Sequence, residues 1–375
     1  MSHVFDLSSL GYGLPEKTAF EPYGAAGLAA GRIGAHHRGG YVVLCELGEL
    51  HGVLPGRHRD RGLRPLQGGS RPAGPAAQPP GLPAVGDWVA FRLLEGGGAR
   101  IEAVLPRRTC FRRGRRDLAR GSQVAEEQVI AANVDVVLLA VDLSLPANPR
   151  SLERYVAAAW DSGAEPVIVL TKLDLCDDVE ARIAEAEAVA MGVPVFAASA
   201  ATGEGVEAVR ALLAGHRTAA LLGPSGSGKS TLVNRLLGRE AQATGAVRSD
   251  GRGRHTTTAR ELFLVPGGGL LLDTPGLRVL QLWEEDGLAG AFADVEQLAA
   301  RCRFSDCSHE TEPGCAVREA VSSGDLDAER LESYAKLARE LAYLERKGDN
   351  RAEAEERRRW RAVTKEARAR ARPRR

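Results

Sequence analysis

The sequence lacks any apolar run of the roughly 18 residues that a membrane-spanning helix needs, and no basic leader precedes an apolar core at its N-terminus. It also lacks an excess of either charge, because 50 basic and 49 acidic residues leave a net charge of +1. A basic character of the whole chain, which would indicate nucleic-acid binding, is therefore absent. We expect a cytoplasmic protein without membrane contact, in which any RNA binding comes from local basic clusters.

Cysteine is scarce, with six residues in 375, and three of the six lie close together. This distribution favours a reducing compartment and a metal site over a disulfide framework.

Lysine is scarce too, since only six of the 50 basic residues are lysine. The chain is longer than one hydrophobic core usually supports, so we expect two to three domains.

A glycine-rich string of nine residues lies between the apolar segments 218–222 and 232–237. A strand, such a loop and a helix are typical of a P-loop, whose backbone N–H groups wrap phosphates at a helix N-terminus. The predicted nucleotide-binding residues are Gly223, Pro224, Ser225, Gly226, Ser227, Gly228, Lys229, Ser230 and Thr231. Lys229 would reach the β- and γ-phosphates, and the Ser230 hydroxyl would ligate Mg²⁺. The string alone leaves open whether the chain transports, phosphorylates or switches.

A second motif indicates the base. The apolar segment 166–170 reads as a buried parallel strand and leads directly into Thr171-Lys172-Leu173-Asp174. This string resembles the guanine-specificity motif of GTPases, usually Asn-Lys-x-Asp. Asp174 would accept hydrogen bonds from both guanine N–H groups, and Lys172 would lie along the ring face. Thr171 replaces the usual Asn, and a hydroxyl has fewer donors than an amide.

Three further loops complete a GTPase set. The apolar run 270–272 leads into Asp273-Thr274-Pro275-Gly276, where Asp273 would hold Mg²⁺ and the Gly276 N–H would sense the γ-phosphate. The run 255–258, His255-Thr256-Thr257-Thr258, would supply a switch threonine for Mg²⁺. Ser199-Ala200, after the strand-like segment 195–198, resembles the remaining base-contacting loop.

The order of these loops differs from that of an ordinary GTPase, which begins with the P-loop and ends with the base motifs. Here the base motifs come first, and a chain permuted in this way keeps its site if the old termini were close together. With the flanking segments described below, the order resembles the ribosome small-subunit-dependent GTPase A family, called RsgA or YjeQ. The resemblance runs from about residue 28 to about residue 345.

The resemblance implies a GTP hydrolase that acts as a late maturation or checkpoint factor of the small ribosomal subunit, binds rRNA and is stimulated by that subunit. Two alternatives stay open: a GTP-binding RNA scaffold without significant turnover, and a different P-loop ATPase or kinase. A transporter ATPase would carry Leu-Ser-Gly-Gly-Gln and an Asp-Glu pair after its apolar strand, and this sequence has neither.

The N-terminal part predicts a small barrel. Residues 1–27 have no clear periodicity and read as a flexible arm, and residues 28–110 contain five short strand-like runs with glycine turns. Such a set favours an RNA-binding OB-fold, which the resemblance also implies. Residues 64–83 are rich in Pro and Gly and read as a loop insertion.

Two arginine clusters lie at residues 57–61 and 107–116, beside the predicted barrel. They are interpreted as contacts to RNA phosphates, with solvated surface charge as the alternative.

Residues 111–288 are predicted to form the permuted α/β GTPase domain, in which buried parallel strands alternate with helices. Helices are expected at 151–163, 178–191 and 205–213. The catalytic residues are predicted to be Lys229, Thr257 and His255. His255 is a candidate to orient water because Leu277 stands where many GTPases have glutamine.

Residues 289–348 are predicted to form a helical zinc-binding module. Cys302, Cys307, His309 and Cys315 supply, within fourteen residues, the four ligands that a structural zinc site takes. The resembled family carries the same spacing. Cys45, Cys110 and Cys176 are isolated and read as ordinary buried thiols.

A helix is expected at 326–346 with its apolar stripe on the zinc module, and residues 349–375 form a charged tail. The chain is expected to be a monomer.

Overall fold

The structure is a computed structural model. It describes residues 4–37, 39–55, 81–116, 125–145, 148–190, 192–239, 260–273 and 285–342, and it describes the backbone alone for 113–116, 125–128 and 285–286. The charged tail, the 57–61 cluster and most of the 64–83 loop lie outside these residues. In the part that is described, no helix is long and apolar enough to cross a membrane.

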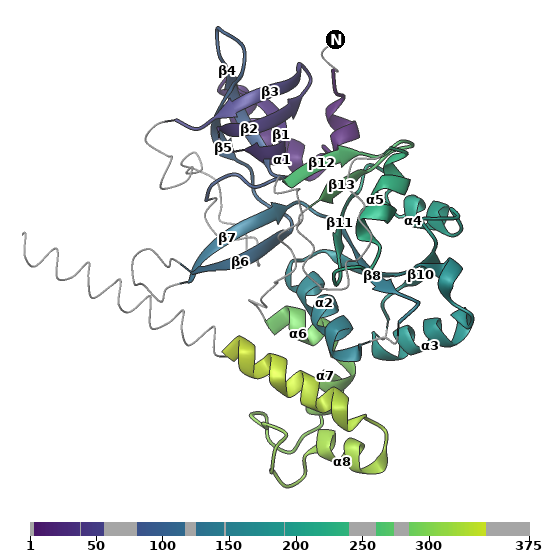
Figure 1. Ribbon diagram of the computed structural model, residues 1–375. Helices are drawn as coiled ribbons and strands as arrows, with labels where there is room; N and C mark the ends of the chain where they lie inside the picture. The colour runs from purple at the N-terminus through teal and green to yellow at the C-terminus, as the bar shows by residue number, and fades with distance from the viewer. Residues whose placement is uncertain are drawn as a thin grey trace, which may run out of the picture.

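The elements, in chain order, are η1 (Leu7–Leu10), α1 (Leu14–Ala25), β1 (Ala29–His37), β2 (Gly40–Cys45), β3 (Gly48–Val53), β4 (Trp88–Leu93), β5 (Ala99–Val104), β6 (Cys110–Arg116), β7 (Ala125–Ala132), β8 (Val136–Asp142), α2 (Pro149–Asp161), β9 (Glu165–Thr171), η4 (Leu173–Leu175), α3 (Val179–Val189), β10 (Val195–Ala198), α4 (Val206–Ala211), β11 (Thr218–Leu222), α5 (Lys229–Leu237), β12 (Arg260–Leu264), β13 (Leu270–Asp273), α6 (Glu285–Ala291), α7 (Ala293–Ala299) and α8 (Ala316–Ser323). A further helix covers residues 328–342. In Figure 1 the α/β domain lies between the barrel and the C-terminal helices.

Strands β1 to β5 form a small barrel in the order β1-β2-β3-β5-β4, and β4 closes it by pairing with β1. Strands β3 and β5 run parallel, whereas the other barrel pairs are antiparallel. Alternate residues of the strands point inward, and Ile33, Val43, Phe91 and Ile101 are fully buried there. The predicted five-stranded OB-fold is confirmed.

The α/β domain is built on five parallel strands in the order β10-β9-β8-β11-β13, with β12 antiparallel at the end of the set. The chain moves outward from β8 to β10 and then returns to β11 on the other side of β8. Ligand loops of such sheets gather at the carboxyl ends of the strands where the direction reverses, here between β8 and β11.

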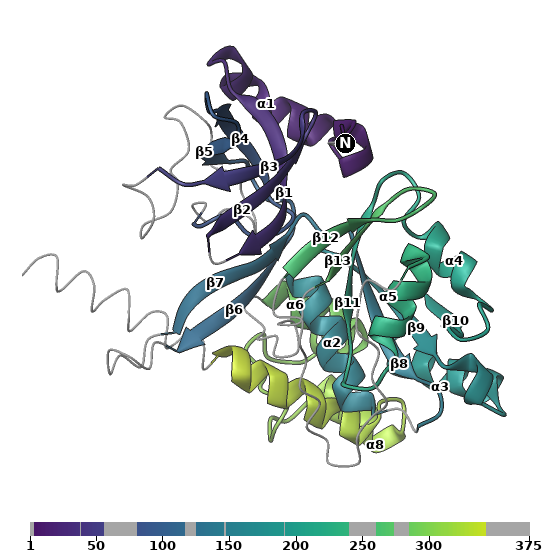
Figure 2. The same cartoon turned by 45° about the horizontal axis from the view of Figure 1, so that its top comes forward.

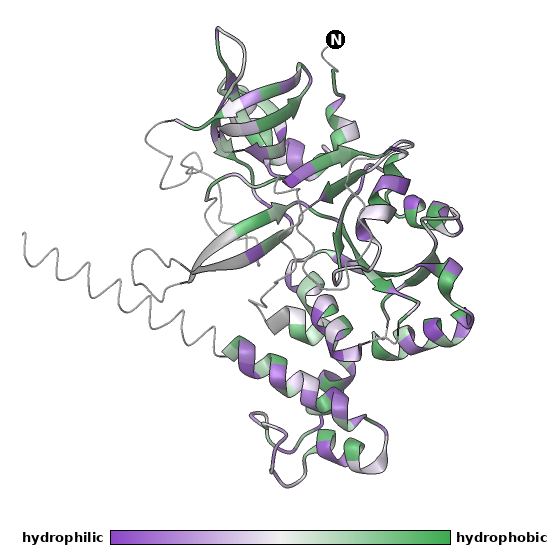
Figure 3. Ribbon diagram, viewed as in Figure 1, coloured by the Kyte–Doolittle hydropathy of each residue, from purple (hydrophilic) through white to green (hydrophobic). Residues whose placement is uncertain are grey.

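Both faces of this sheet are covered, which explains its nearly continuous apolar strands (Figure 3). Val136 and Leu138 of β8 face one core, which α4 and α5 complete, and Val137 and Leu139 face the core that contains α2. The three helices predicted in this region are confirmed, with bounds that differ by one or two residues at each end.

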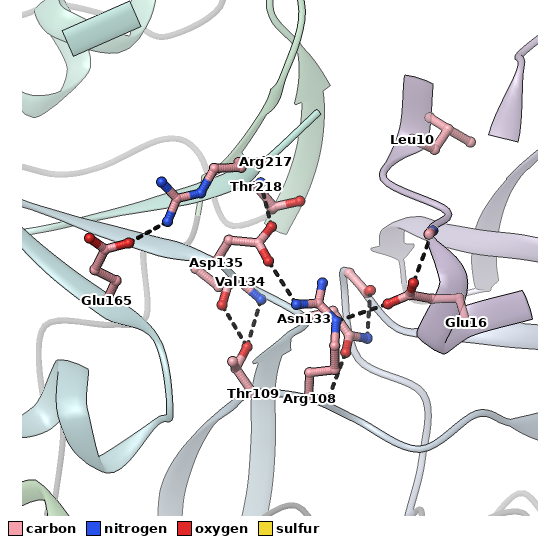
Figure 4. A network of polar contacts seen from close by, with 12 residues as sticks. Leu10, Glu16, Arg108, Thr109, Asn133, Val134, Asp135, Glu165, Arg217 and Thr218 are labelled. Atoms are coloured by element: carbon pink, nitrogen blue, oxygen red, sulfur yellow. Dashed lines mark hydrogen bonds and ion pairs between the residues drawn. The ribbon is translucent and has the colours of Figure 1, made fainter. Parts of the chain in front are cut away.

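The N-terminal region is not the loose arm that the sequence suggests, because residues 7–10 and 14–25 are helical. The Tyr12 ring packs on Trp88 with centroids 4.9 Å apart. Glu16 is buried, and its carboxylate accepts from the Arg108 Nε at 2.9 Å (Figure 4). The fully buried Arg32 donates to three backbone carbonyls, including that of Leu10. These contacts fix the N-terminal helices on the barrel and on the domain junction.

Part of the second arginine cluster is engaged inside the protein. Arg107 makes two hydrogen bonds of 2.7 Å to the buried carboxylate of Asp87. Arg108 binds Asp135 at 2.8 Å as well as Glu16; burial acts to lower its pKa, but these two carboxylates outweigh burial and the pKa is raised. Arg112 is buried with its Nε 3.3 Å from the Cys110 Sγ. Arg107 and Arg112 are thus buried against internal partners, whereas Arg108 is 40% exposed, and phosphate contact by this cluster stays a prediction.

Strands β6 and β7 pair into a separate two-stranded hairpin. Both views of the ribbon show it projecting from the junction, on the same side of the molecule as the C-terminal helix (Figures 1 and 2).

The C-terminal helix 328–342 is attached to the α/β domain as well as to the zinc module. Arg330 binds Asp294 of α7 through two hydrogen bonds of 2.6 and 2.7 Å and reaches Glu153 of α2 at 3.1 Å. Arg154 of α2 makes two bonds of 2.8 Å to Glu340. Of the predicted apolar stripe, Leu337 and Leu341 are buried and the Tyr334 ring lies 6.4 Å from that of His309, so the stripe packs inward while the same helix also contacts α2.

Candidate nucleotide site and metal centre

Four of the predicted loops follow strands of one sheet, at the same edge. The P-loop follows β11, the base motif begins at the end of β9, Ser199 follows β10 and Asp273 ends β13. Because these four strands are parallel, their carboxyl ends bring the loops together on the two sides of the reversal between β8 and β11.

The P-loop turns sharply at Gly223 and enters α5 at Gly228. Gly223 has φ +143°, and a Cβ at this position would come within 2.4 Å of the Ala140 carbonyl oxygen, so only glycine fits. Gly228 precedes the first helical residue in the left-handed region, with φ +76°. Ser230 and Thr231 lie in the first turn of α5, where unpaired N–H groups favour an anion.

The Lys229 ammonium lies against its own loop. Its Nζ donates to the Gly223 carbonyl at 2.9 Å and to the Pro224 carbonyl, and lies 3.4 Å from the Ser227 Oγ. Carbonyl oxygens are weaker partners for an ammonium than phosphate oxygens are. The loop therefore holds the Lys229 ammonium where it can exchange these carbonyl oxygens for the oxygens of a phosphate chain.

Thr171 links the base motif to the P-loop. Its hydroxyl oxygen lies 2.8 Å from the Ser227 carbonyl oxygen and 3.0 Å from that of Val141. A threonine hydroxyl has one proton, so it donates to one of these carbonyls at a time. Thr171 therefore makes the link between the base motif and the P-loop that is expected of the usual Asn, but with fewer hydrogen bonds.

Asp174 and Ser199 bring the two base-contacting loops together. The Ser199 hydroxyl donates to Asp174 Oδ1 and accepts from the Thr202 N–H at 3.1 Å. Ser199 is fully buried, whereas Asp174 is exposed. An exposed carboxylate that is held by a buried hydroxyl suits recognition of the two N–H donors of guanine, and Ala200 follows in the same loop.

Lys172 forms an ion pair that its motif alone does not predict. Its Nζ lies 2.6 Å from Asp142 Oδ2, and Asp142 Oδ1 accepts from the Ser144 N–H and hydroxyl at 2.9 and 2.6 Å. Burial acts to raise the pKa of Asp142, but the hydrogen bonds from Lys172 and Ser144 outweigh it and the pKa is lowered. A carboxylate at the end of a buried parallel strand was the available signal for Asp142.

Five predicted residues of the phosphate side are not described. They are His255, Thr256, Thr257, Thr258 and Gly276, which lie outside the described residues. Asp273 is described, at the end of β13 beside the P-loop strand, where the register pairs Ala220 with Leu272. With Ser230 it would hold a magnesium ion, which neutralises charge that develops on the transferring phosphate.

The four predicted metal ligands come together in the C-terminal module. One ligand atom from each of Cys302, Cys307, His309 and Cys315 lies within 4.8 Å of the other three. The Cys302 and Cys315 sulfurs are 3.9 Å apart and lie 3.7 and 3.5 Å from His309 Nδ1. A tetrahedral zinc ion with its usual bond lengths places its ligands about 3.6–3.8 Å apart. The cluster therefore fits structural zinc, with four protein ligands and no open position. Cys45, Cys110 and Cys176 are free thiols away from it; Cys45 and Cys110 are buried as predicted, whereas Cys176 is partly exposed because it follows the exposed base loop.

Comparison with known proteins identifies the family. The model of the RsgA GTPase family matches residues 104–283. The small ribosomal subunit biogenesis GTPase RsgA of Opitutus terrae is 44% identical over 378 residues, which cover 98% of this chain and 98% of that protein. This chain belongs to the RsgA family. The RsgA of Streptomyces coelicolor is 44% identical over 93% of this chain and 90% of its own length.

Solved structures agree with this assignment. The crystal structure of YjeQ from Thermotoga maritima superposes with a TM-score of 0.60 at 27% identity, covering 84% of this chain and 99% of its own. The circularly permuted GTPase YloQ has the same fold, with a TM-score of 0.57 at 23% identity over 84% of this chain and 95% of its own. The predicted resemblance and the permuted GTPase fold are confirmed, and this RsgA-family chain is a GTPase.

Proposed function

We propose that this chain hydrolyses GTP as a late maturation or checkpoint factor of the small ribosomal subunit, and that the subunit stimulates the hydrolysis. The observation that carries the proposal is the match to relatives named for small-subunit biogenesis, which extends over barrel, GTPase domain and zinc cluster alike. A match to the GTPase domain alone would give weaker support to this proposal, because the same fold occurs in proteins with many different functions.

The proposed nucleotide site assigns a role to each loop. The P-loop residues 223–231 bind the phosphates, Asp174 reads guanine, and Ser230, Thr257 and Asp273 hold magnesium. The contacts of Thr171 to Ser227 and of Ser199 to Asp174 support one continuous site, since they join the three loops that such a site needs.

The rRNA contact is assigned to the barrel and to the zinc module. Arg107 and Arg112 are buried with internal partners, so within the cluster 107–116 the proposed contact is assigned to the other arginines. Zinc has a structural role, which is to fix the loop that begins α8. The protein acts as a cytoplasmic monomer.

The decisive experiment measures GTP hydrolysis by the purified chain alone, with small ribosomal subunits and with large subunits. We expect slow hydrolysis alone and a clear acceleration by the small subunit only, because a switch that lacks the usual glutamine needs a partner to order it. Binding to the small subunit without any turnover would favour the GTP-binding scaffold instead. Hydrolysis of ATP at the same rate as GTP would favour a different P-loop enzyme.

A further inference from the structure

The contact between Asp142 and Lys172 joins the ends of two neighbouring strands. Asp142 ends β8 and Thr171 ends β9, and these two residues are opposite each other in the parallel register. The Asp142 side chain is 10% exposed and that of Lys172 is 32% exposed. The pair is thus half enclosed, at the sheet edge where the loops of the nucleotide site gather.

Asp142 is itself a rigid anchor. Both hydrogen bonds from Ser144 go to Oδ1, so Oδ2 is left facing the Lys172 ammonium at 2.6 Å. A carboxylate held by two local donors loses little further freedom when it binds a cation. Lysine, in contrast, has a flexible stem with several rotatable bonds, and fixing it costs conformational entropy.

The backbone of Lys172 shows that its position is specified. Lys172 has φ +61°, a left-handed conformation that is uncommon for a residue with a side chain. Thr171 on one side is tied to the P-loop and Asp174 on the other is tied to Ser199. Since the backbone is fixed and the Nζ is fixed by Asp142, the methylene stem between them has a defined direction.

We infer that Asp142 is a positioning residue that holds the stem of Lys172 along the face of a purine ring. It contributes to affinity for purine nucleotides in general and makes no contribution to the choice among them, which belongs to Asp174. The inference rests on the proposed base site, because it assumes that the base lies at Lys172.

The test compares dissociation constants for GDP and IDP, two nucleotides that differ by the exocyclic amino group of the base. The Asp142→Asn variant keeps the shape of the side chain and removes its charge. We expect it to weaken GDP and IDP by the same factor, about tenfold, because one charge-assisted hydrogen bond is lost. The ratio of the two constants stays at the wild-type value.

A double-mutant cycle separates positioning from a general structural role. In a Lys172→Ala background the Asp142→Asn change should have no further effect on GDP affinity, because the side chain that it positions is gone. Additive losses in the cycle would overturn the inference. So would a GDP affinity of Asp142→Asn within twofold of the wild type, or a change in the GDP-to-IDP ratio. The fraction of active protein, from the binding stoichiometry, corrects for misfolding.

The matched control lies at the opposite edge of the same sheet. Glu165 begins β9 and pairs with Arg217, which immediately precedes β11, and the two side chains are 49% and 37% exposed. Glu165→Gln makes the same chemical change in an ion pair between strands of this sheet, away from the nucleotide loops. We expect unchanged GDP affinity. If the wild type binds GDP no better than ADP, the base site itself is wrong, which is distinct from failure of the role of Asp142.

Discussion

His36 of barrel strand β1 lies opposite Arg260 of strand β12 in an antiparallel pair. Strand β12 also pairs with β13, so one sheet runs from the GTPase domain into the barrel. Arg260 follows directly after the segment that carries the predicted switch threonines 256–258. The barrel strand β1 is therefore hydrogen-bonded to β12, which follows the predicted switch segment. A displacement of β12 would be transmitted directly to the barrel.

The same contact makes a prediction about pH. His36 stacks on Tyr41 with ring centroids 4.6 Å apart. Its pKa is lowered below the ordinary 6.5, mainly by burial and to a smaller extent by the charges of Arg260 and His37. A histidine whose pKa is lowered on folding binds more protons in the unfolded chain, so stability is lost as pH falls through 6.5. When the pH is lowered from 7.5 to 5.5, we expect the urea midpoint of unfolding to decrease less in His36→Asn than in the wild type. Equal shifts in both proteins would contradict this.

Thr171 provides the second prediction. Thr171→Val keeps the shape of the side chain and removes the hydroxyl that contacts Ser227 and Val141, so the one donor that these two carbonyls share is lost. We expect GTP affinity to fall by about 1–2 kcal/mol with little change in kcat. Thr171→Asn restores the usual motif and supplies two N–H donors, so its GTP affinity should equal or exceed that of the wild type. Weaker binding in Thr171→Asn would show that the pocket is fitted to threonine.

Much of this architecture follows from local patterns in the sequence. The motifs at 171–174 and 223–231 each follow a short apolar run, and the sheet edge gathers such loops because parallel strands end together. The barrel strands are predicted because alternation and glycine turns are also local signals. The metal cluster lies within fourteen residues, so its spacing alone brings the ligands together.

What the sequence does not reveal depends on partners far away in the chain. In the sequence Arg107 and Arg108 are only members of a basic cluster. In the structure Arg107 binds Asp87, and Arg108 binds Glu16, which lies 92 residues earlier in the chain. The helix α1 has no clear apolar stripe and contains Pro22, so its periodicity is weak although its position is fixed by tertiary contacts. Asp142 was missed for the same reason, since its partner Lys172 lies 30 residues away.

The third prediction concerns zinc. Structural zinc contributes folding free energy to small modules, which are often unfolded without it. Cys307→Ser or Cys315→Ser should unfold residues 295–320, seen as rapid amide exchange there, and leave GTP binding near normal. Cys176→Ser removes an isolated thiol and is the control. Metal analysis of the purified wild type should give about one equivalent of zinc, and less than about half an equivalent would argue against the site.

The fourth prediction concerns the base. Asp174 is held by Ser199 and would accept from both guanine N–H groups. Asp174→Asn replaces an acceptor by an amide donor, so it should lose selectivity for GTP over xanthosine triphosphate, whose base presents a carbonyl at that position. Lys229→Ala should instead weaken all nucleotides, because it removes a phosphate contact. Equal affinity of the wild type for ATP and GTP would exclude the base site.

The fifth prediction concerns the catalytic water. Leu277 follows the Asp-x-x-Gly motif and has no hydrogen-bonding group, so another residue has to orient the attacking water. His255 adjoins the switch threonines, and an imidazole can orient water or take a proton near neutral pH. His255→Ala should keep the affinity for GTP and for the small subunit, and should lose most of the subunit-stimulated rate, on the order of a hundredfold.

The matched comparison for this last variant is His216→Ala, which changes a histidine in the turn before β11, far along the chain from the switch segment. Its stimulated rate should stay within about twofold of the wild type, after correction for the fraction of active protein. A normal stimulated rate in His255→Ala would exclude His255 as the residue that orients the water. If both variants lose the rate equally, the loss reflects general damage to the domain, because of these two histidines only His255 is expected to lie near the γ-phosphate.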